Sequence, residues 1–288
     1  MTVRSFGETV APGFNFVFEG RLLHSEQSPF QHIEVYEHEY FGRVLVLDHT
    51  IQTTLTDEFA YHELLVHPAL CSLPEPRDVL IIGGGDGGTL RRVLEHGPVR
   101  AVQCEIDEAV TRVSREHLPE VSAGALDDPR AELVFDDGAA YAAAHPAEFD
   151  AVIVDSTDPV GAAAVLVSES FYRDCLKALK PGGVLVAQTG SPLYQANEFR
   201  VAVSNMSRVF DVVEPYFGIV PTYPGAYWSW TAATQGPPVS RAPMAVVRGR
   251  MSSRNLSCGY YTPELHRSLF AVPGFAPRPL PQKPGAGA

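Results

Sequence analysis

A run of glycines with one acid inside it is the clearest chemical signal in the chain. Gly83, Gly85 and Gly88 satisfy the GxGxxG spacing, and Asp86 lies between the last two of them. An apolar stretch at 79–82 precedes the run, and a predicted helix opens after it. Glycine turns also occur without ligands, but a strand, a glycine turn and a helix in this order are typical of folds that bind a nucleotide or nucleoside. The pattern predicts a ligand site at this turn.

Two further acidic positions follow at the spacing expected of a nucleoside site. Glu105 ends the next predicted strand, about 20 residues after the glycines, where a carboxylate can accept both ribose hydroxyl hydrogens. Asp137 and Gly138 follow the third predicted strand, and an acid there can accept the amino hydrogens of adenine, although the neighbouring Asp136 could serve instead. NAD and adenosyl-sulfonium donors both use this arrangement, so these residues alone do not separate the two ligands.

A second acidic group follows the predicted strand 151–154, where Asp155 and Asp158 lie three residues apart. Ligands of such sheets lie beyond the carboxyl ends of the strands, so Asp86, Asp155 and Asp158 should converge on one pocket. A solvated loop with a helix cap would explain Asp155 alone. All three carboxylates together repel one another and need a compensating cation, which a polyamine would supply.

Asp86 also bears on the choice of donor. S-adenosylmethionine carries a carboxylate on its amino-acid arm, and an acid in the glycine turn would repel it. Without that carboxylate the arm ends in an ammonium, which Asp86 would attract. The position therefore favours decarboxylated S-adenosylmethionine over the donor of a methyltransferase.

The elements that must position these residues form two groups. Alternating and β-prone stretches between 14 and 55 predict a small antiparallel β-domain. From 78 onward apolar strands alternate with helices, which predicts an α/β fold with a parallel, doubly wound, Rossmann-like sheet. The expected division is an N-terminal β-domain at 1–55 and a catalytic domain at 56–288, with Thr56 capping the first helix. The Pro- and Gly-rich end from 277 is expected to be flexible.

Composition narrows the class of protein. Hydrophobic residues make up 45% of the 288 residues, enough for a sizeable core. The net charge of -12 argues against nucleic-acid binding and suits cationic ligands, although solubility alone would also explain it. Four scattered cysteines, three of them in apolar segments, and ten scattered histidines without HExxH suggest buried thiols and no metal site. No signal peptide or membrane-spanning stretch is readable, so we expect a cytoplasmic protein without membrane partners.

The chain resembles the spermidine synthase (polyamine aminopropyltransferase) family in seven blocks, which occur in order between about 14 and 275. They are 46–52, 57–63, 83–88, 104–107, 155–161, 219–224 and 260–266. The resemblance implies a class I methyltransferase-like Rossmann domain beside a small N-terminal β-domain. It also implies transfer of the aminopropyl group of decarboxylated S-adenosylmethionine to a diamine, putrescine by default, giving spermidine and methylthioadenosine. No cofactor or metal is implied, and the family forms homodimers or homotetramers.

The resemblance also implies residue roles. Asp155 matches the catalytic acid-base residue, which Tyr61 assists. The donor or methylthioadenosine would be bound by Gln31, Gly83, Gly85, Asp86, Glu105, Asp137 and Gly138. The polyamine would be held by Tyr61, His62, Asp86, Asp155, Asp158 and Tyr223. Each single residue also has a structural reading: Tyr61 as core, His62 as a surface histidine, Gln31 as a strand residue and Tyr223 as a loop anchor.

One loop departs from the family pattern. The family has a proline after the glycine and then an acid, whereas here Gly161 is followed by Ala162, Ala163 and Ala164. In the family this loop closes over the substrates, so lid behaviour and choice of amine stay open. Cadaverine, agmatine or spermidine would also fit an acidic slot. Rival functions are a small-amine N-methyltransferase using S-adenosylmethionine and an inert polyamine-binding protein, whereas an NAD-dependent oxidoreductase gives the acidic group no role.

Overall fold

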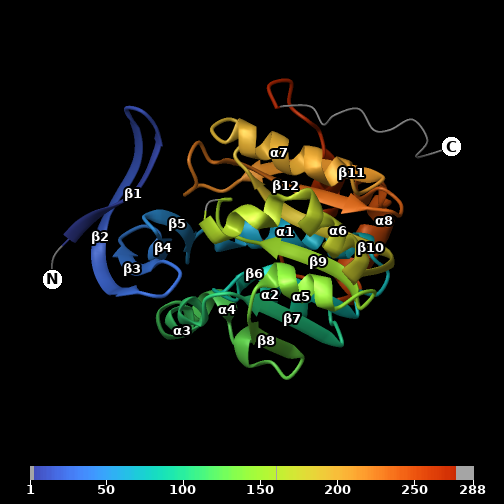
Figure 1. The fold of residues 1–288 in the computed structure, drawn as a ribbon, viewed down its shortest axis with the longest axis horizontal. Helices are drawn as coiled ribbons and strands as arrows, with labels where there is room; N and C mark the ends of the chain where they lie inside the picture. Colours follow the sequence, from blue (N-terminus) through green and yellow to red (C-terminus); the bar gives the residue numbers. More distant parts are fainter. Residues whose placement is uncertain (1–2, 160, 277–288) are drawn as a thin grey trace.

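The computed structural model describes residues 3–159 and 161–276, and their strands form two sheets (Figure 1). The first sheet is antiparallel and runs in chain order. Its strands are β1 (Val3–Ala11), β2 (Phe14–Gln27), β3 (His32–His38), β4 (Gly42–Leu47) and β5 (Thr50–Thr54). An antiparallel N-terminal sheet was predicted, but β1 was not among the predicted strands.

The second sheet has seven strands in the order β11-β12-β10-β9-β6-β7-β8. They are β6 (Asp78–Gly83), β7 (Arg100–Glu105), β8 (Ala131–Phe135), β9 (Phe149–Asp155), β10 (Leu179–Gly190), β11 (Val212–Ile219) and β12 (Tyr227–Thr234). The five predicted strands, β6 to β10, are parallel, as expected of a doubly wound sheet. Beyond these five strands the sheet is mixed, because β12 runs antiparallel to both its neighbours. Only a short loop joins β11 to β12, and such a connection allows only an antiparallel pair.

Helices cover both faces of this second sheet. One apolar core lies under α1, α2, α8 and α9, and the other under α5, α6 and α7. The helices are α1 (Glu58–Ser72), α2 (Gly88–Leu94), α3 (Glu108–His117), α4 (Pro119–Ser122), α5 (Gly138–Ala144), α6 (Glu169–Ala178), α7 (Ala196–Ser207), α8 (Met244–Ser253) and α9 (Pro263–Leu269), with the 3-10 helices η1 (Ala125–Asp127), η2 (Gly161–Val167) and η3 (Val239–Arg241). In the part of the chain that is described, no helix has both the length and the apolar character that crossing a bilayer requires.

A third apolar cluster joins the first sheet to α3 and α4. Ile33 and Leu45 of the first sheet pack with Val110 and Val113 of α3, all of them buried. Figure 1 shows the first sheet beside the ends of the strands of the second, next to α3 and α4. Burial of this apolar surface fixes the first sheet over the edge where ligands of such folds bind.

The start of α1 differs from the prediction. Thr56 is exposed, and the residue before the helix is Asp57, whose side chain does not cap it. The Asp57 carboxylate accepts instead from Thr54 Oγ1 at 2.6 Å and from the amide and hydroxyl of Thr222 at 2.9 and 2.7 Å. Bonds from Thr54 and from the distant Thr222 thus replace the helix cap. The predicted flexible end from 277 lies outside the described residues.

Candidate active site

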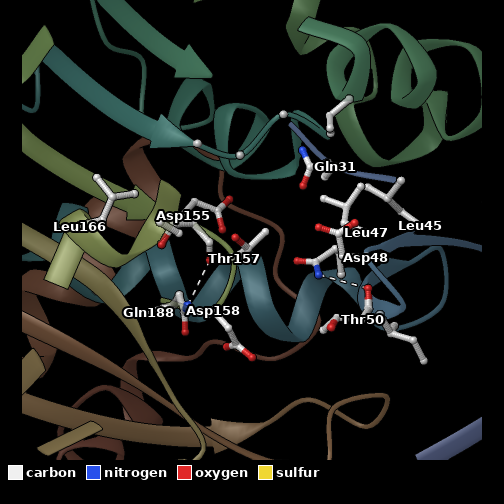
Figure 2. Close-up of a pocket in the computed structure, with 18 of the residues that line it drawn as sticks. Gln31, Leu45, Leu47, Asp48, Thr50, Asp155, Thr157, Asp158, Leu166 and Gln188 are labelled. Carbon is white, nitrogen blue, oxygen red and sulfur yellow. Dashed lines mark hydrogen bonds between the residues drawn. The ribbon is translucent and has the colours of Figure 1, made fainter. Parts of the chain in front are cut away.

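A cavity of about 1100 Å³ lies between the first sheet and the carboxyl ends of the strands of the second. Small-molecule pockets usually measure about 300–1,000 Å³, so this cavity has room for two substrates. Gln31, Asp48 and Thr50 lie across it from Asp155 and Asp158 (Figure 2). The predicted site residues all line it: Gln31, Tyr61, His62, Gly83, Gly85, Asp86, Glu105, Asp137, Gly138, Asp155, Asp158 and Tyr223.

Asp155 ends β9 with both carboxylate oxygens hydrogen-bonded. Tyr61 Oη donates to its Oδ1 at 2.7 Å, and Thr89 Oγ1 donates to its Oδ2 at 2.7 Å. Burial raises the pKa of Asp155, and the charge of Asp86 adds to the effect, while His62 and the two hydrogen bonds oppose it. Such a carboxyl group is well suited to take up a proton. Thr89 was not predicted, although its place in the first turn after the glycines was a usable signal.

The glycine turn and the strand of Asp155 are locked together. Gly83 has φ +85°, and a Cβ there would lie 2.1 Å from the carbonyl oxygen of Asp155. The amide of Gly84 donates to that same oxygen at 2.9 Å. Only glycine allows this close approach, so the turn holds Asp155 as well as any ligand.

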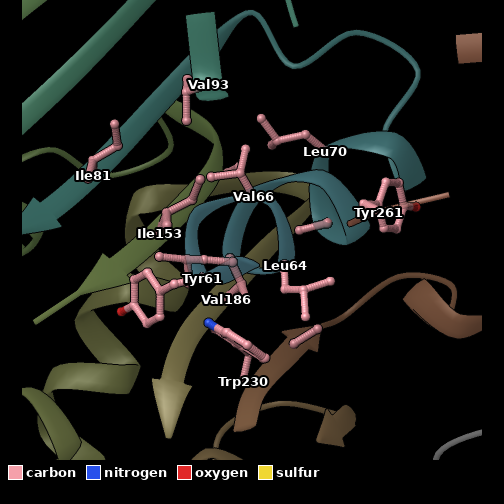
Figure 3. Close-up of a cluster of buried hydrophobic side chains, with 14 of the residues drawn as sticks. Tyr61, Leu64, Val66, Leu70, Ile81, Val93, Ile153, Val186, Trp230 and Tyr261 are labelled. Atoms are coloured by element: carbon pink, nitrogen blue, oxygen red, sulfur yellow. The ribbon is translucent and has the colours of Figure 1, made fainter. Parts of the chain in front are cut away.

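Tyr61 is both a core residue and a site residue. Its ring lies 5.8 Å from that of Trp230 and 5.7 Å from that of Tyr223, and Figure 3 shows it beside the apolar side chains of α1. Burial and then the charge of Asp155 hold the pKa of its hydroxyl well above 10. The hydroxyl therefore keeps its proton and donates it to Asp155 in a hydrogen bond.

His62 connects two acids. Its Nδ1 lies 2.8 Å from Glu58 Oε2, and its Nε2 lies 3.6 Å from Asp86 Oδ2. Burial alone would lower the pKa of His62, but the two carboxylates raise it to about 10. His62 is buried and positively charged at neutral pH, so it is not the surface histidine of the structural reading. Its charge also lowers the pKa of Asp86 against the effect of burial, which means that Asp86 is partly balanced before any ligand arrives.

The nucleoside end is linked through a residue without a predicted role, Asp107. Its amide donates to Glu105 Oε1 at 2.9 Å, and its Oδ2 accepts from Gln31 Nε2 at 3.0 Å and from Ser28 Oγ at 2.6 Å. Burial raises the pKa of Glu105 to about 7. Gln31 and Glu105, 74 residues apart in the sequence, are thus held against one wall of the cavity.

Asp137 rather than Asp136 lines the cavity. Asp137 caps α5, because its Oδ1 accepts from the amide of Ala139 at 2.8 Å. Gly138 follows, and a Cβ there would meet Ile82 Cγ2 at 2.4 Å. Of the two neighbouring acids that the sequence left open, only Asp137 is in place to meet a ligand.

At the other end of the cavity, the predicted amine-binding residues are hydrogen-bonded to partners that were not predicted from the sequence. Asp158 Oδ2 accepts from Gln195 Nε2 at 2.7 Å, and Tyr223 Oη donates to the carbonyl of Gln52 at 2.7 Å. The ring of Tyr223 meets Trp228 edge-on at 4.6 Å. The departing loop forms η2, which contributes Ala163, Val165 and Leu166 to the cavity.

Comparison with known proteins decides the family. A model of the spermine/spermidine synthase domain matches residues 58–242, and a model of the spermidine synthase tetramerisation domain matches residues 9–54. The chain belongs to the spermine/spermidine synthase family. It is an aminopropyltransferase, as the sequence predicted.

Relatives and solved structures agree with this assignment. The polyamine aminopropyltransferase of Desulforudis audaxviator is 45% identical over 266 residues, 91% of this chain and 94% of the relative. The polyamine aminopropyltransferase of Thermotoga maritima is 42% identical over 268 residues, which make up 92% of this chain and 89% of the relative. A solved spermidine synthase in complex with the transition-state analogue AdoDATO has a TM-score of 0.89 at 39% identity, covering 94% of this chain and 92% of that one. These matches also confirm the Rossmann-like fold with its N-terminal β-domain.

Proposed function

We propose that the enzyme transfers the aminopropyl group of decarboxylated S-adenosylmethionine to a diamine, putrescine by default, giving spermidine and methylthioadenosine. The observation that carries this proposal is the Asp155 carboxylate. It lines an acidic cavity and is held on both oxygens by Tyr61 and Thr89. The AdoDATO complex of the structurally similar spermidine synthase supports the choice of donor.

The reaction is a direct displacement. Asp155 takes a proton from the attacking ammonium, and the neutral nitrogen then attacks the methylene beside the sulfonium. A carbon–nitrogen bond forms as the carbon–sulfur bond breaks, and its electron pair leaves with sulfur in neutral methylthioadenosine. Tyr61 keeps its own proton and fixes the orientation of Asp155. Alignment of the two reacting atoms in one cavity gives much of the rate acceleration, and we propose no cofactor or metal.

The remaining residues divide between the substrates. Gln31, Glu105, Asp137 and the glycine turn would bind the nucleoside of the donor. Asp86, backed by the His62 imidazolium, would bind the ammonium of the aminopropyl arm. On the acceptor, Asp158 and Tyr223 would bind the diamine. With this assignment, Asp155 would lie between the two substrates, where the proton of the attacking ammonium must be removed.

The test compares donors and acceptors directly. The enzyme is incubated with decarboxylated or intact S-adenosylmethionine and with putrescine, cadaverine, agmatine or spermidine, and the products are identified by mass. We expect an aminopropylated amine from the decarboxylated donor and no methylated amine from the intact one. Methylation from intact S-adenosylmethionine, or no turnover with any of these amines, would overturn the proposal.

We also propose a homo-oligomer, a dimer or a tetramer, assembled through the first sheet. The match of residues 9–54 to a tetramerisation domain supports it. Light scattering should give two or four times 31.3 kDa, and a species of 31.3 kDa would contradict it. A cytoplasmic location and the lack of nucleic-acid affinity stay predictions, to be tested by cell fractionation and gel-shift assay.

A further inference from the structure

A row of buried charges of alternating sign runs behind the reaction site, between α1 and α2. His62 Nδ1 lies 2.8 Å from Glu58 Oε2, and the other oxygen of Glu58 accepts from Arg92 at 3.1 Å. Arg92 in turn lies 3.9 Å from Glu63 Oε1. All four side chains are buried, and of the four only His62 lines the cavity. The other three can therefore affect a substrate only through His62.

The inner end of this row is anchored to the backbone. Glu63 accepts from the backbone amides of residues 259–261 at 2.7, 2.8 and 2.9 Å. Arg92 also donates to Glu95 Oε1 at 3.0 Å, and an arginine keeps its charge at every pH at which the protein is folded. Arg92 is thus a fixed cation behind Glu58, and it lowers the pKa of Glu58 together with His62, against the effect of burial.

The imidazole of His62 is held by packing as well as by charge. A Cβ at Gly88 would lie 2.2 Å from His62 Cε1, so the glycine turn lies directly against the ring. Nδ1 faces Glu58, and Nε2 faces Asp86 Oδ2 at 3.6 Å. Both ring nitrogens therefore point at carboxylates, which suits the imidazolium because it carries an N–H on each nitrogen.

The surroundings of the ring show which group its charge depends on. Its titratable and charged neighbours are Glu58 and Tyr61 on α1, Asp86 in the glycine turn and Asp155 at the end of β9, with Arg91 and Arg92 of α2 behind Glu58. Tyr61 adds no charge, because burial and then Asp155 hold the pKa of its hydroxyl well above 10. If Glu58 lost its charge, burial and the two arginines would both disfavour the imidazolium.

The charge on His62 matters for the proposed base. Burial raises the pKa of Asp155, the His62 charge lowers it and the Asp86 charge raises it. A base must have lost its own proton before it can accept one from the substrate. Without the imidazolium, Asp86 and Asp155 would be two like charges in one buried site, and Asp155 would hold its proton to a higher pH.

We infer that Glu58, held by Arg92, is a positioning residue of the reaction: it keeps His62 oriented and positively charged, and through that charge it keeps Asp155 free to accept a proton at neutral pH. The inference rests on the proposed aminopropyl transfer. Glu58 does not line the cavity, so it acts through the imidazole, and the proton transfer itself stays with Asp155.

The test is a pH profile of Glu58→Gln, which removes the charge but keeps an oxygen that can accept from His62 Nδ1. kcat/KM for putrescine is measured at saturating decarboxylated S-adenosylmethionine in wild type and variant. Protonation of the free amine affects both enzymes equally, so it cancels in their ratio. We expect the variant to be slower by about tenfold or more at pH 7 and to come within about threefold of wild type at pH 9, because its Asp155 loses its proton about one pH unit or more higher.

Two further variants are matched controls. Glu95→Gln removes another acid from the same arginine, but one that does not line the cavity, and it should leave kcat/KM unchanged at every pH. Glu58→Asp keeps the charge and should restore the shape of the wild-type profile. A loss in Glu58→Gln that is equal at every pH would show a merely structural role, and an unchanged rate at pH 7 would show that the charge does not reach Asp155; either result overturns the inference.

Nitrogen NMR of the imidazole tests the charge directly, with the His62 signals assigned by their absence in His62→Asn. At pH 7 we expect an imidazolium in wild type and a neutral ring in Glu58→Gln. An imidazolium in both would overturn the inference, and so would a neutral ring in wild type, even where Glu58→Gln does not fold. Failure of wild type to use any amine would instead overturn the proposed function, and the spectra would still test the role of Glu58.

Discussion

At the residue scale, the proposed base already accepts two hydrogen bonds and must still accept a proton. Each carboxylate oxygen has two lone pairs, so the bonds from Tyr61 and Thr89 leave acceptor capacity on both oxygens of Asp155. Those bonds fix the orientation of the group, and burial makes it more basic than an exposed aspartate. The bonds from Tyr61 and Thr89 therefore set the position of Asp155, and they also lower the pKa that burial raises.

Asp155→Asn tests the base. Asparagine has the same size, and its carbonyl oxygen can still accept from Tyr61, but it cannot take up a proton. We expect turnover to fall about 100-fold or more while methylthioadenosine binding is kept. Single-turnover kinetics and calorimetry measure the two effects separately. Near-normal turnover would show that another group, or water, removes the proton.

Asp86→Asn tests donor choice. In wild type we expect decarboxylated S-adenosylmethionine to bind at least about tenfold more tightly than the intact donor, a difference of about 1.4 kcal/mol. Asp86→Asn should narrow this preference for two reasons. The variant no longer repels the carboxylate of the intact donor, and the positive charge of His62, 3.6 Å from Asp86 in wild type, is no longer balanced by Asp86. Competitive binding of the two donors at matched salt measures the ratio.

The opposite variant is the control for that measurement. His62→Asn removes the positive charge that balances Asp86, so it should widen the preference for the decarboxylated donor. Equal affinities of the two donors in wild type would contradict the role of Asp86 and would favour a methyltransferase.

At the scale of elements, the sequence predicted best where one physical pattern dominates. Strands β6 and β9 are short apolar runs buried on both faces. Glycines or acids follow them in the sequence and mark where they end, so both strands were predicted. Strand β12 is equally buried but has no regular alternation, and β1 is mostly exposed, so neither was predicted. Site residues inside motifs were predicted for the same reason, since a motif is local. Gln195 was missed because the loop around it gives no signal and only tertiary packing brings it to Asp158.

Asp57 shows how a buried acid can join elements instead of capping one. It links β5, the start of α1 and the loop that carries Tyr223, through its bonds to Thr54 and Thr222. Asp57→Ala leaves these buried donors without a partner, so we expect a loss of about 3 kcal/mol in the free energy of unfolding. Urea unfolding measures it. Thr56→Ala is the matched control and should cost less than about 1 kcal/mol, whereas equal losses would mean that Thr56 is the cap after all.

At the scale of the whole molecule, a chain of one guanidinium and two buried imidazoles joins distant segments. Arg254, after α8, donates to His96 Nδ1 at 2.9 Å, and His96 Nε2 lies 2.9 Å from His67 Nδ1 on α1. Arginine can only donate, so His96 must carry its proton on Nε2 and give it to His67 in a hydrogen bond. Both imidazoles are therefore neutral in the folded protein, and a further proton on either one would break the chain.

This arrangement predicts loss of stability in mild acid. Burial lowers the pKa of His67 to about 3 and that of His96 well below its ordinary value of 6.5. Below pH 6.5 the unfolded chain takes up protons at these positions and the folded protein does not, so the contribution of these two histidines to stability falls as pH falls from 6.5 toward 3. For His67 alone the loss at pH 5 is about 2 kcal/mol. Urea unfolding between pH 7.5 and 5 measures the trend.

His67→Asn isolates the contribution of one ring. Asparagine can still accept from His96 Nε2 but does not titrate, so near pH 5 the unfolded chain binds one proton fewer than in wild type. The slope of the free energy of unfolding against pH should then fall by about 1.4 kcal/mol per pH unit. Val66→Ala, a buried change at the neighbouring position of α1, should lower stability at every pH and leave the slope unchanged. A wild-type slope in His67→Asn would mean that His67 already carries its proton in the folded protein, which the hydrogen-bond chain from Arg254 does not allow.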